Sequence, residues 1–111
     1  MIAFVTEFIG TFVFLASILI ASAYYPAVFV PLISVIALLA MMYFGINASG
    51  AHFNPAISTM MLVKGDLTVE KYIGYVVAQI LGGLVALLWY HQMIKANPVG
   101  EVASIEPWLK K

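Results

Sequence analysis

The stretch "NASGAHFNPAIS", residues 47–58, decides the fold of this chain. It is small, polar and turn-forming, yet it stands between two long apolar runs. Gly50 relaxes the restrictions on the backbone, and Pro55 disfavours the α conformation at Asn54. We therefore predict that residues 47–53 are extended or irregular, in a chain that is otherwise strongly apolar.

The composition around this stretch is that of a membrane protein. Hydrophobic residues make up 64% of the 111 residues and charged residues only 9%, whereas soluble proteins carry roughly 25% charged residues. No Asp, Glu, Lys or Arg occurs between Glu7 and Lys64. These features predict one domain that is integral to a membrane. The net charge of zero gives no sign of a nucleic-acid partner, and the lack of cysteine excludes thiol chemistry.

Three apolar runs are long enough to cross a bilayer, whose core of about 30 Å needs about 20 helical residues. They cover roughly residues 4–23, 28–46 and 69–94. The piece between the second and third runs, residues 54–64, would reach only about 16 Å as a helix. That length predicts a half-length helix that enters the membrane and returns to the same side.

Turn-forming residues mark the ends of these elements. The charged turn "KGD" at residues 64–66 closes the half-length helix, and either Thr68 or Asp66 can cap the last span. Residues 96–111, with their prolines and charges, read as an extramembrane tail or a truncated loop. A signal peptide over residues 1–23 is a weaker alternative, because no Lys or Arg precedes the apolar run.

The Asn-Pro pair has a physical reason to lie at membrane depth. Asn is a favoured N-cap and Pro a favoured first helical residue, so Asn54 and Pro55 predict a helix start. Its positive N-terminal end would point toward the membrane centre, where it repels cations and accepts neutral solutes. Irregular backbone at this depth must be buried in protein or line a watery cavity. The backbone carbonyls expected along such a cavity belong to Gly50, Ala51, His52 and Phe53.

The stretch also resembles a known family. "SGAHFNPAIS", residues 49–58, is similar to the first signature of the aquaporins, the major intrinsic protein family of water and glycerol channels. "EFIGTF" at 7–12 and "GYVVAQILGG" at 74–83 resemble its first and third helices. The resemblance, over roughly residues 4–94, implies an all-α membrane fold of three transmembrane helices and one re-entrant half-helix. Residues 1–95 would form this aquaporin-like half-channel repeat.

The resemblance also implies the residues of a pore. Asn54, Pro55 and Ala56 match the family's Asn-Pro-Ala motif, whose Asn amide donates hydrogen bonds to water at the middle of the pore. Residues 50–53 match the segment whose carbonyls line one side of the pore. His52 would lie near the cytoplasmic half of the pore, or its side chain would only brace the loop.

Two polar residues inside the spans resemble the family's loop supports. Glu7 and Gln79 match buried side chains that hold the re-entrant loop, with the Glu accepting N–H groups of that loop. For Glu7, an alternative is a place at the membrane edge with the carboxylate reaching water. Both residues could also serve simple packing. The glycines that fit a close approach of helices are Gly10, Gly74, Gly82 and Gly83.

The chain departs from the family pattern at the filter. Counting back from Asn54 puts the filter position of the second helix at Ser34, where the family has an aromatic residue. The family's filter Arg follows its second Asn-Pro-Ala motif, whereas Ile57 follows the motif here and the chain has no Arg. A pore built from two copies of this chain is therefore predicted to be wider and less discriminating than a strict water channel.

One half-helix closes only half a pore, so we expect a second half. It would be the missing C-terminal half of a longer chain, or a second copy inserted antiparallel, which the weak Lys bias of the loops permits. The expected function is a passive channel module for water and small neutral solutes such as glycerol. The alternative is a non-conducting half that acts as a membrane scaffold or associates with full-length relatives.

The remaining expectations concern chemistry, partners and location. His52 and Glu7 share their depth with no second carboxylate or nucleophile, so we expect no enzymatic activity, and we expect no cofactor or metal. The partners expected are the lipid bilayer, water or a small neutral solute, and the second half. By family resemblance, the pores are tetrameric, and the protein lies in the plasma or inner membrane with a cytoplasmic N-terminus.

Overall fold

The computed structural model describes residues 1–99, and these residues form helices and no strands. The predicted tail over residues 96–111 falls mostly outside the described residues. The elements are α1 (Ile2–Tyr24), the short 3₁₀ helix η1 (Ala27–Phe29), α2 (Val30–Ser49), α3 (Pro55–Lys64) and α4 (Val69–Ala96). In the described part, three stretches are long and apolar enough to cross a membrane: α1, η1 together with α2, and α4. The predicted fold class is thereby confirmed.

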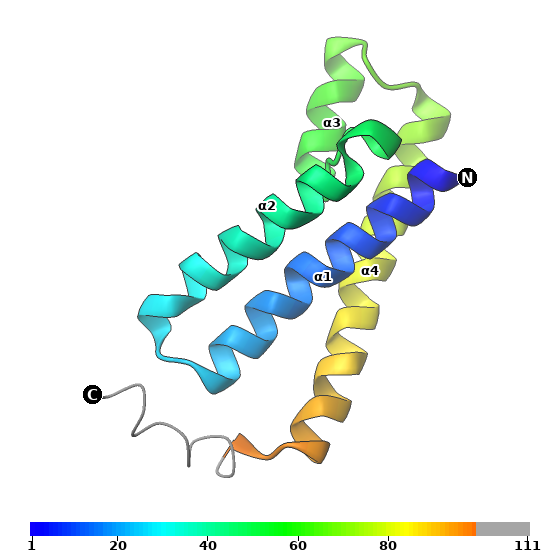
Figure 1. The fold of residues 1–111 in the computed structure, drawn as a ribbon. Helices are drawn as coiled ribbons and strands as arrows, with labels where there is room; N and C mark the ends of the chain where they lie inside the picture. Colours follow the sequence, from blue (N-terminus) through cyan, green and yellow to red (C-terminus); the bar gives the residue numbers. More distant parts are fainter. Residues whose placement is uncertain (100–111) are drawn as a thin grey trace.

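The helices form an elongated bundle in which α1 contacts both α2 and α4 (Figure 1). α1 and α2 run antiparallel, and α3 packs against α4. α3 begins near the middle of the bundle and runs back to the end at which α2 finishes and α4 begins (Figure 1). Its 10 residues span about 15 Å, whereas the 28 residues of α4 span about 42 Å. α3 is therefore a re-entrant half-helix.

The boundary after the second span differs from the prediction. Residues 47–49 continue α2, so the prediction that the irregular segment begins at residue 47 was wrong. α2 ends at Gly50, which has φ 86° and donates its N–H to the carbonyl of Ile46 at 3.1 Å. Glycine adopts this left-handed conformation without steric cost, so it ends the helix better than the preceding Asn or Ser.

The segment that joins α2 to α3, residues 50–53, is irregular but not extended. Ala51 and Phe53 have φ angles of 53° and 54°, which few residues other than glycine adopt. Of the two predicted alternatives, extended or irregular, the structure therefore shows the irregular one. A backbone of this kind persists only where surrounding contacts hold it in place.

The caps of the last two helices agree with the sequence. Asn54 precedes α3, and its Oδ1 accepts a hydrogen bond from the N–H of Ala56 at 2.8 Å, with Pro55 as the first helical residue. Of the two candidates for the cap of α4, the structure selects Thr68, whose Oγ1 accepts from the N–H of Lys71 at 3.2 Å.

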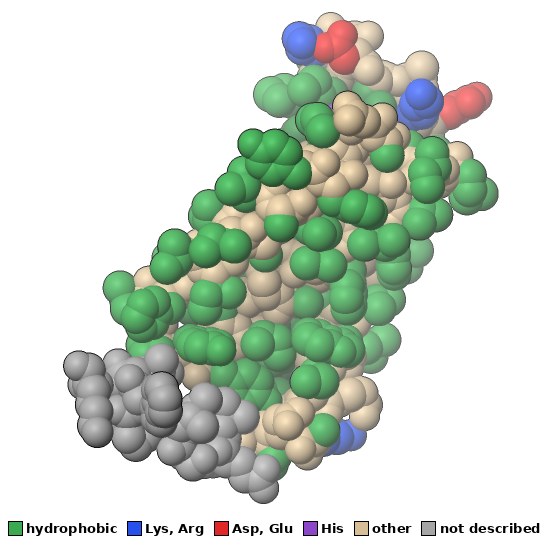
Figure 2. Space-filling view, in the orientation of Figure 1, with side chains coloured by type: hydrophobic (Ala, Val, Ile, Leu, Met, Phe, Trp, Pro, Cys, Tyr) green, Lys and Arg blue, Asp and Glu red, His purple; other side chains and the backbone are tan. Residues whose placement is uncertain are grey.

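The packing reverses that of a soluble protein. Small and polar side chains lie inside the bundle, and many of the large apolar ones are exposed on its surface. Figure 2 shows hydrophobic side chains along the length of the bundle and charged ones near its ends. This distribution suits a surrounding of lipid. The buried polar residues are Thr6, Glu7, Thr11, Ser34, Ser49, His52, Ser58 and Gln79.

Candidate functional site

A single buried carboxylate collects donors from three parts of the chain. The Glu7 side chain, on α1, is fully buried. Its Oε2 accepts hydrogen bonds from Ser49 Oγ at 2.6 Å and from the N–H of His52 at 3.0 Å. Its Oε1 accepts from the N–H of Phe53 at 2.7 Å and from Gln79 Nε2 at 2.8 Å. Burial of a carboxylate is tolerable only with such partners, so these contacts fix the loop against α1 and α4.

The hydrogen bonds continue from Gln79 into α3. Gln79 Nε2 also donates to Ser58 Oγ at 2.9 Å, and the same oxygen lies 2.9 Å from His52 Nδ1. The His52 ring packs edge-on against Tyr75, with 5.0 Å between the ring centroids. Tyr75 donates its hydroxyl to the carbonyl of Ser49 at 2.6 Å. We call the set formed by Glu7, Ser49, His52, Phe53, Ser58, Tyr75 and Gln79 the Glu7 cluster.

The cluster holds the unusual backbone of the loop. The N–H of Ala51 donates to Ser49 Oγ at 3.1 Å, and the N–H of Phe53 donates to Glu7. Among the described residues, these two are the non-glycine residues with positive φ. The carbonyls of residues 50–53 accept no hydrogen bond from any other described residue. The N–H groups of the loop thus donate to protein atoms, whereas its carbonyl oxygens stay available to accept hydrogen bonds.

The ring of Phe53 is a contact that the sequence interpretation did not foresee. The side chain is only 2% exposed. A Cβ placed on Gly10 would lie 2.1 Å from this ring, and one placed on Gly45 would lie 2.8 Å from it. The ring therefore occupies the space that two glycines leave between α1 and α2. The sequence signal for this contact was a large aromatic residue, Phe53, within a stretch of small residues.

Three polar members of the cluster were also missed. Ser49 and Ser58 lie in the small, polar stretch at residues 47–58, and Tyr75 lies in an apolar run. Their sequence positions alone do not show that their side chains join one cluster. Ser58 is fully buried. Polar side chains in a membrane span are usually partnered inside the protein, and this general rule was the only signal available.

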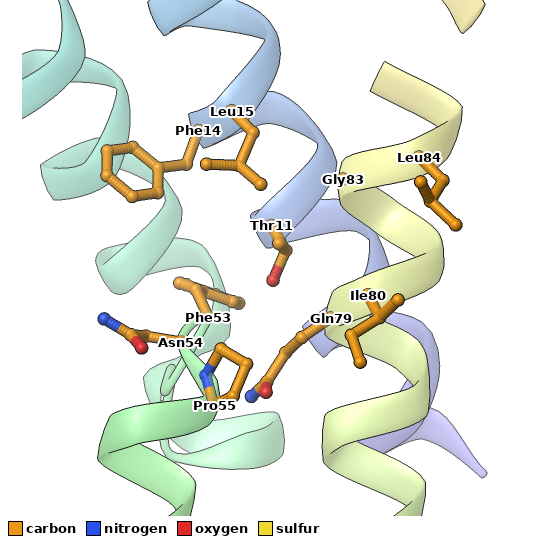
Figure 3. A pocket seen from close by; sticks show the side chains of 10 residues that line it. All are labelled: Thr11, Phe14, Leu15, Phe53, Asn54, Pro55, Gln79, Ile80, Gly83 and Leu84. Atoms are coloured by element: carbon orange, nitrogen blue, oxygen red, sulfur yellow. The ribbon is translucent and has the colours of Figure 1, made fainter. Parts of the chain in front are cut away.

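The start of α3 lies at an open pocket of about 480 Å³ near the middle of α1 and α4 (Figure 3). Pro55 lies on the side of Gln79, whereas the amide of Asn54 extends away from Gln79 (Figure 3). Asn54 is exposed, and its Nδ2 makes no hydrogen bond within the described residues. Two donor hydrogens and the N-terminal end of a helix are thus available at mid-depth of the bundle.

Ser34 stands apart from this site. It lies on the same helix as Ser49 but 15 residues earlier, which is about 22 Å along the helix axis. Its side chain is buried, and its Oγ donates to the carbonyl of Val30 at 2.7 Å. The structure therefore does not bring Ser34 to the Glu7 cluster.

Glu7 is the one charged member of the Glu7 cluster, although Asp66 and Lys71 line a pocket together with Ser49, His52 and Tyr75. At the end of α3, the exposed Nζ of Lys64 lies 2.7 Å from Asp66 Oδ2. The hydrogen bond from this ammonium to Asp66 raises the pKa of Lys64 above its ordinary value. No group of three or more metal-ligating side chains occurs among residues 1–99.

Fold and site define an α-helical membrane protein in which a buried carboxylate holds a re-entrant half-helix. Residues 1–107 match the sequence model of the major intrinsic protein family, and the chain belongs to that family. The resemblance identified from residues 49–58 is confirmed.

Curated relatives match parts of the chain. Glycerol uptake facilitator protein-like 6 of Lactiplantibacillus plantarum is 36% identical over 85 residues, which are 75% of this chain and 39% of that protein. Probable aquaporin TIP3-2 of Arabidopsis thaliana is 41% identical over 61 residues, 55% of this chain and 23% of its own length. Aquaglyceroporin AqpS of Rhizobium meliloti is 39% identical over 51 residues, 46% of this chain and 22% of its own length. The chain thus spans well under half of these relatives, and no solved structure matches it significantly.

Proposed function

We propose that the chain forms one half of a passive channel for water and small neutral solutes such as glycerol, completed by a second half. The observation that carries the proposal is α3, a half-length helix that begins at mid-depth, where Asn54 Nδ2 has no partner among the described residues. The names of the relatives, which include a glycerol uptake facilitator and aquaporins, agree with this proposal.

The proposed mechanism replaces hydration without a chemical step. A solute that enters the pore exchanges its water contacts for the carbonyls of residues 50–53 and the amide donors of Asn54. Pro55 and Ala56 complete the motif by starting the helix whose positive end repels cations and protons. Because no bond is broken, the protein acts as a channel and not as an enzyme.

In this mechanism, Glu7 and Gln79 position the loop and do not contact the solute. Glu7 accepts the N–H groups of His52 and Phe53, so the carbonyls of the loop are left for the solute. Gln79 fixes the Glu7 carboxylate from α4. The ring of His52 braces the loop through Ser58 and Tyr75, in addition to the role of its carbonyl.

The second half comes from the remainder of a longer chain or from an antiparallel copy. We further propose that Ser34 stands at the filter position, where its small side chain leaves a pore wide enough for glycerol. The assembled protein lies in the cell membrane with the N-terminus in the cytoplasm. Its pores associate as tetramers in the lipid bilayer.

The test is stopped-flow swelling and shrinking of proteoliposomes that contain the purified chain in its assembled form. Asn54→Asp places a carboxylate at the helix end, so we expect water and glycerol permeability to fall about tenfold or cations to enter. Asn97→Asp, at the exposed end of α4, is the matched control and should leave permeability unchanged.

Two results contradict the proposal. Equal permeability and equal cation exclusion for Asn54→Asp and the original chain would show that Asn54 does not line a pore. Liposomes with the original chain that swell no faster than empty liposomes would favour the alternative of a non-conducting scaffold.

A further inference from the structure

Two buried oxygen atoms lack partners in the pocket of Figure 3. They are Thr11 Oγ1, on α1, and Gln79 Oε1, on α4. Each residue is only 2% exposed, and neither atom has a hydrogen-bond partner among the described residues. Both side chains extend into the space between α1 and α4, beside Pro55 (Figure 3). Since buried polar atoms are normally paired, this arrangement points to a ligand.

The orientation of the Gln79 amide is fixed by its neighbours. Its Nε2 donates to Glu7 Oε1 at 2.8 Å and to Ser58 Oγ at 2.9 Å. A reversed amide would place an oxygen against a carboxylate oxygen, and neither can donate. Oε1 must therefore face the pocket, where it requires a hydrogen-bond donor.

Thr11 differs from the other hydroxyl residues of the helices. Several of them donate to a backbone carbonyl three or four residues earlier in the same helix, which is the usual arrangement. These residues are Thr6, Ser17, Ser34 and Thr59. Thr11 makes no such bond and is left with both a donor and an acceptor for the pocket.

We propose that Thr11 and Gln79 bind one ordered water molecule on the side of Pro55 away from the Asn54 amide. The water donates one hydrogen bond to Gln79 Oε1, and its oxygen accepts a hydrogen bond from the hydroxyl of Thr11. The ligand is neutral and small because the remaining wall is largely apolar and carries no charged residue. The pocket of about 480 Å³ has ample room for a water molecule, and two polar partners suffice to hold one.

The bound water also supports the loop. It completes the hydrogen bonds of the Gln79 amide, whose other end donates to Glu7, and Glu7 in turn accepts the N–H groups of His52 and Phe53. Removal of the water therefore loosens the loop from a distance. This inference rests on contacts within the described half and does not require that the protein conduct.

The direct test is a crystal structure of the purified, assembled chain in a lipidic phase, at a resolution that shows water. We expect solvent density within hydrogen-bond distance of both Thr11 Oγ1 and Gln79 Oε1. This density should be lost in Thr11→Val, which keeps the shape of the side chain, and retained in Thr11→Ser. Empty space there, or an N–H group of the second half bonded to Gln79 Oε1, overturns the proposal.

Hydrogen–deuterium exchange tests the coupling to the loop. We expect the amides of His52 and Phe53 to exchange about fivefold faster in Thr11→Val, because a support of Gln79 is lost. Thr6→Val is the matched control, since Thr6 is equally buried on α1 but bonds its own helix. Equal rates for Thr11→Val and Thr6→Val would show that no water supports the loop through Gln79.

Discussion

Most apolar side chains of helix α2 are exposed and none is buried, whereas every polar side chain of the Glu7 cluster is buried. Only 6% of the apolar window of η1 and α2 lies inside the bundle, against 28% for the window of α1. Leu32, Leu39 and Phe44 are each more than half exposed, whereas Glu7 and Ser58 are fully buried. In water, both arrangements would cost free energy.

This difference in burial shows that the fold is suited to lipid and not to water. Lipid chains solvate apolar side chains as well as other apolar side chains do, so exposure of α2 costs little. Lipid offers no hydrogen bonds, so polar groups must find partners inside the protein. We infer that hydrogen bonds and close contacts of small residues stabilise the fold more than apolar burial does. Substitutions in the two regions should therefore differ in size.

Removal of the carboxylate should have the largest effect. Glu7→Leu leaves the N–H groups of His52 and Phe53 without an acceptor, and we expect the free energy of unfolding to fall by about 3 kcal/mol or more. The measurement is denaturant-induced unfolding in micelles, followed by tryptophan fluorescence. Glu70→Leu, in the exposed first turn of α4, is the matched control. A similar loss in both variants would mean that the Glu7 cluster does not stabilise the fold.

Two adjacent glycines of α4 test the close contacts between helices. A Cβ on Gly82 would lie 2.7 Å from the backbone oxygen of Phe8, whereas one on Gly83 would lie 3.0 Å from the end of the Leu15 side chain. A backbone atom cannot move aside as a side chain can, so we expect Gly82→Ala to cost about 1–3 kcal/mol and Gly83→Ala clearly less. The same unfolding measurement compares the two, and a reversed order would contradict the geometry.

Truncation on the exposed face should have the smallest effect. Leu39 is 53% exposed, and lipid replaces the contacts that its side chain makes. We therefore expect Leu39→Ala to change the free energy of unfolding by less than about 0.5 kcal/mol in the same micelles. A loss of several kcal/mol would instead show that protein covers this face of α2 in the assembled state.

Local signals were sufficient to predict the three spans and the start of α3. The apolar runs exceed the length that a bilayer needs, so the three spans follow from hydropathy. Asn54 and Pro55 carry the preferences of a cap and a first helical residue, and α3 begins as they predict. The end of α2 was misplaced because turn-forming residues at 47–49 favour a break, whereas the left-handed cap at Gly50 sets it. The pore roles of Asn54, Ser34 and the loop carbonyls stay predictions.

The polar contacts were only partly accessible from the sequence. Resemblance pointed to Glu7 and Gln79, but not to Ser58 or to the ring of Phe53. Gln79 is 72 residues from Glu7 along the chain, and Ser49 is 42 residues from it. No pattern of neighbouring residues encodes contacts over such separations.

The sequence by itself determined the membrane class, the three spans and the half-helix that Asn54 starts, because hydropathy, length and capping act within a few residues. Only the tertiary structure decided which polar groups meet. Thr6 and Thr11 make this plain, since both are buried threonines of α1. Thr6 bonds its own helix, whereas Thr11 opens onto a pocket shared with Gln79. The two threonines differ because α4 and the loop place different groups beside them. No local sequence rule predicts those contacts.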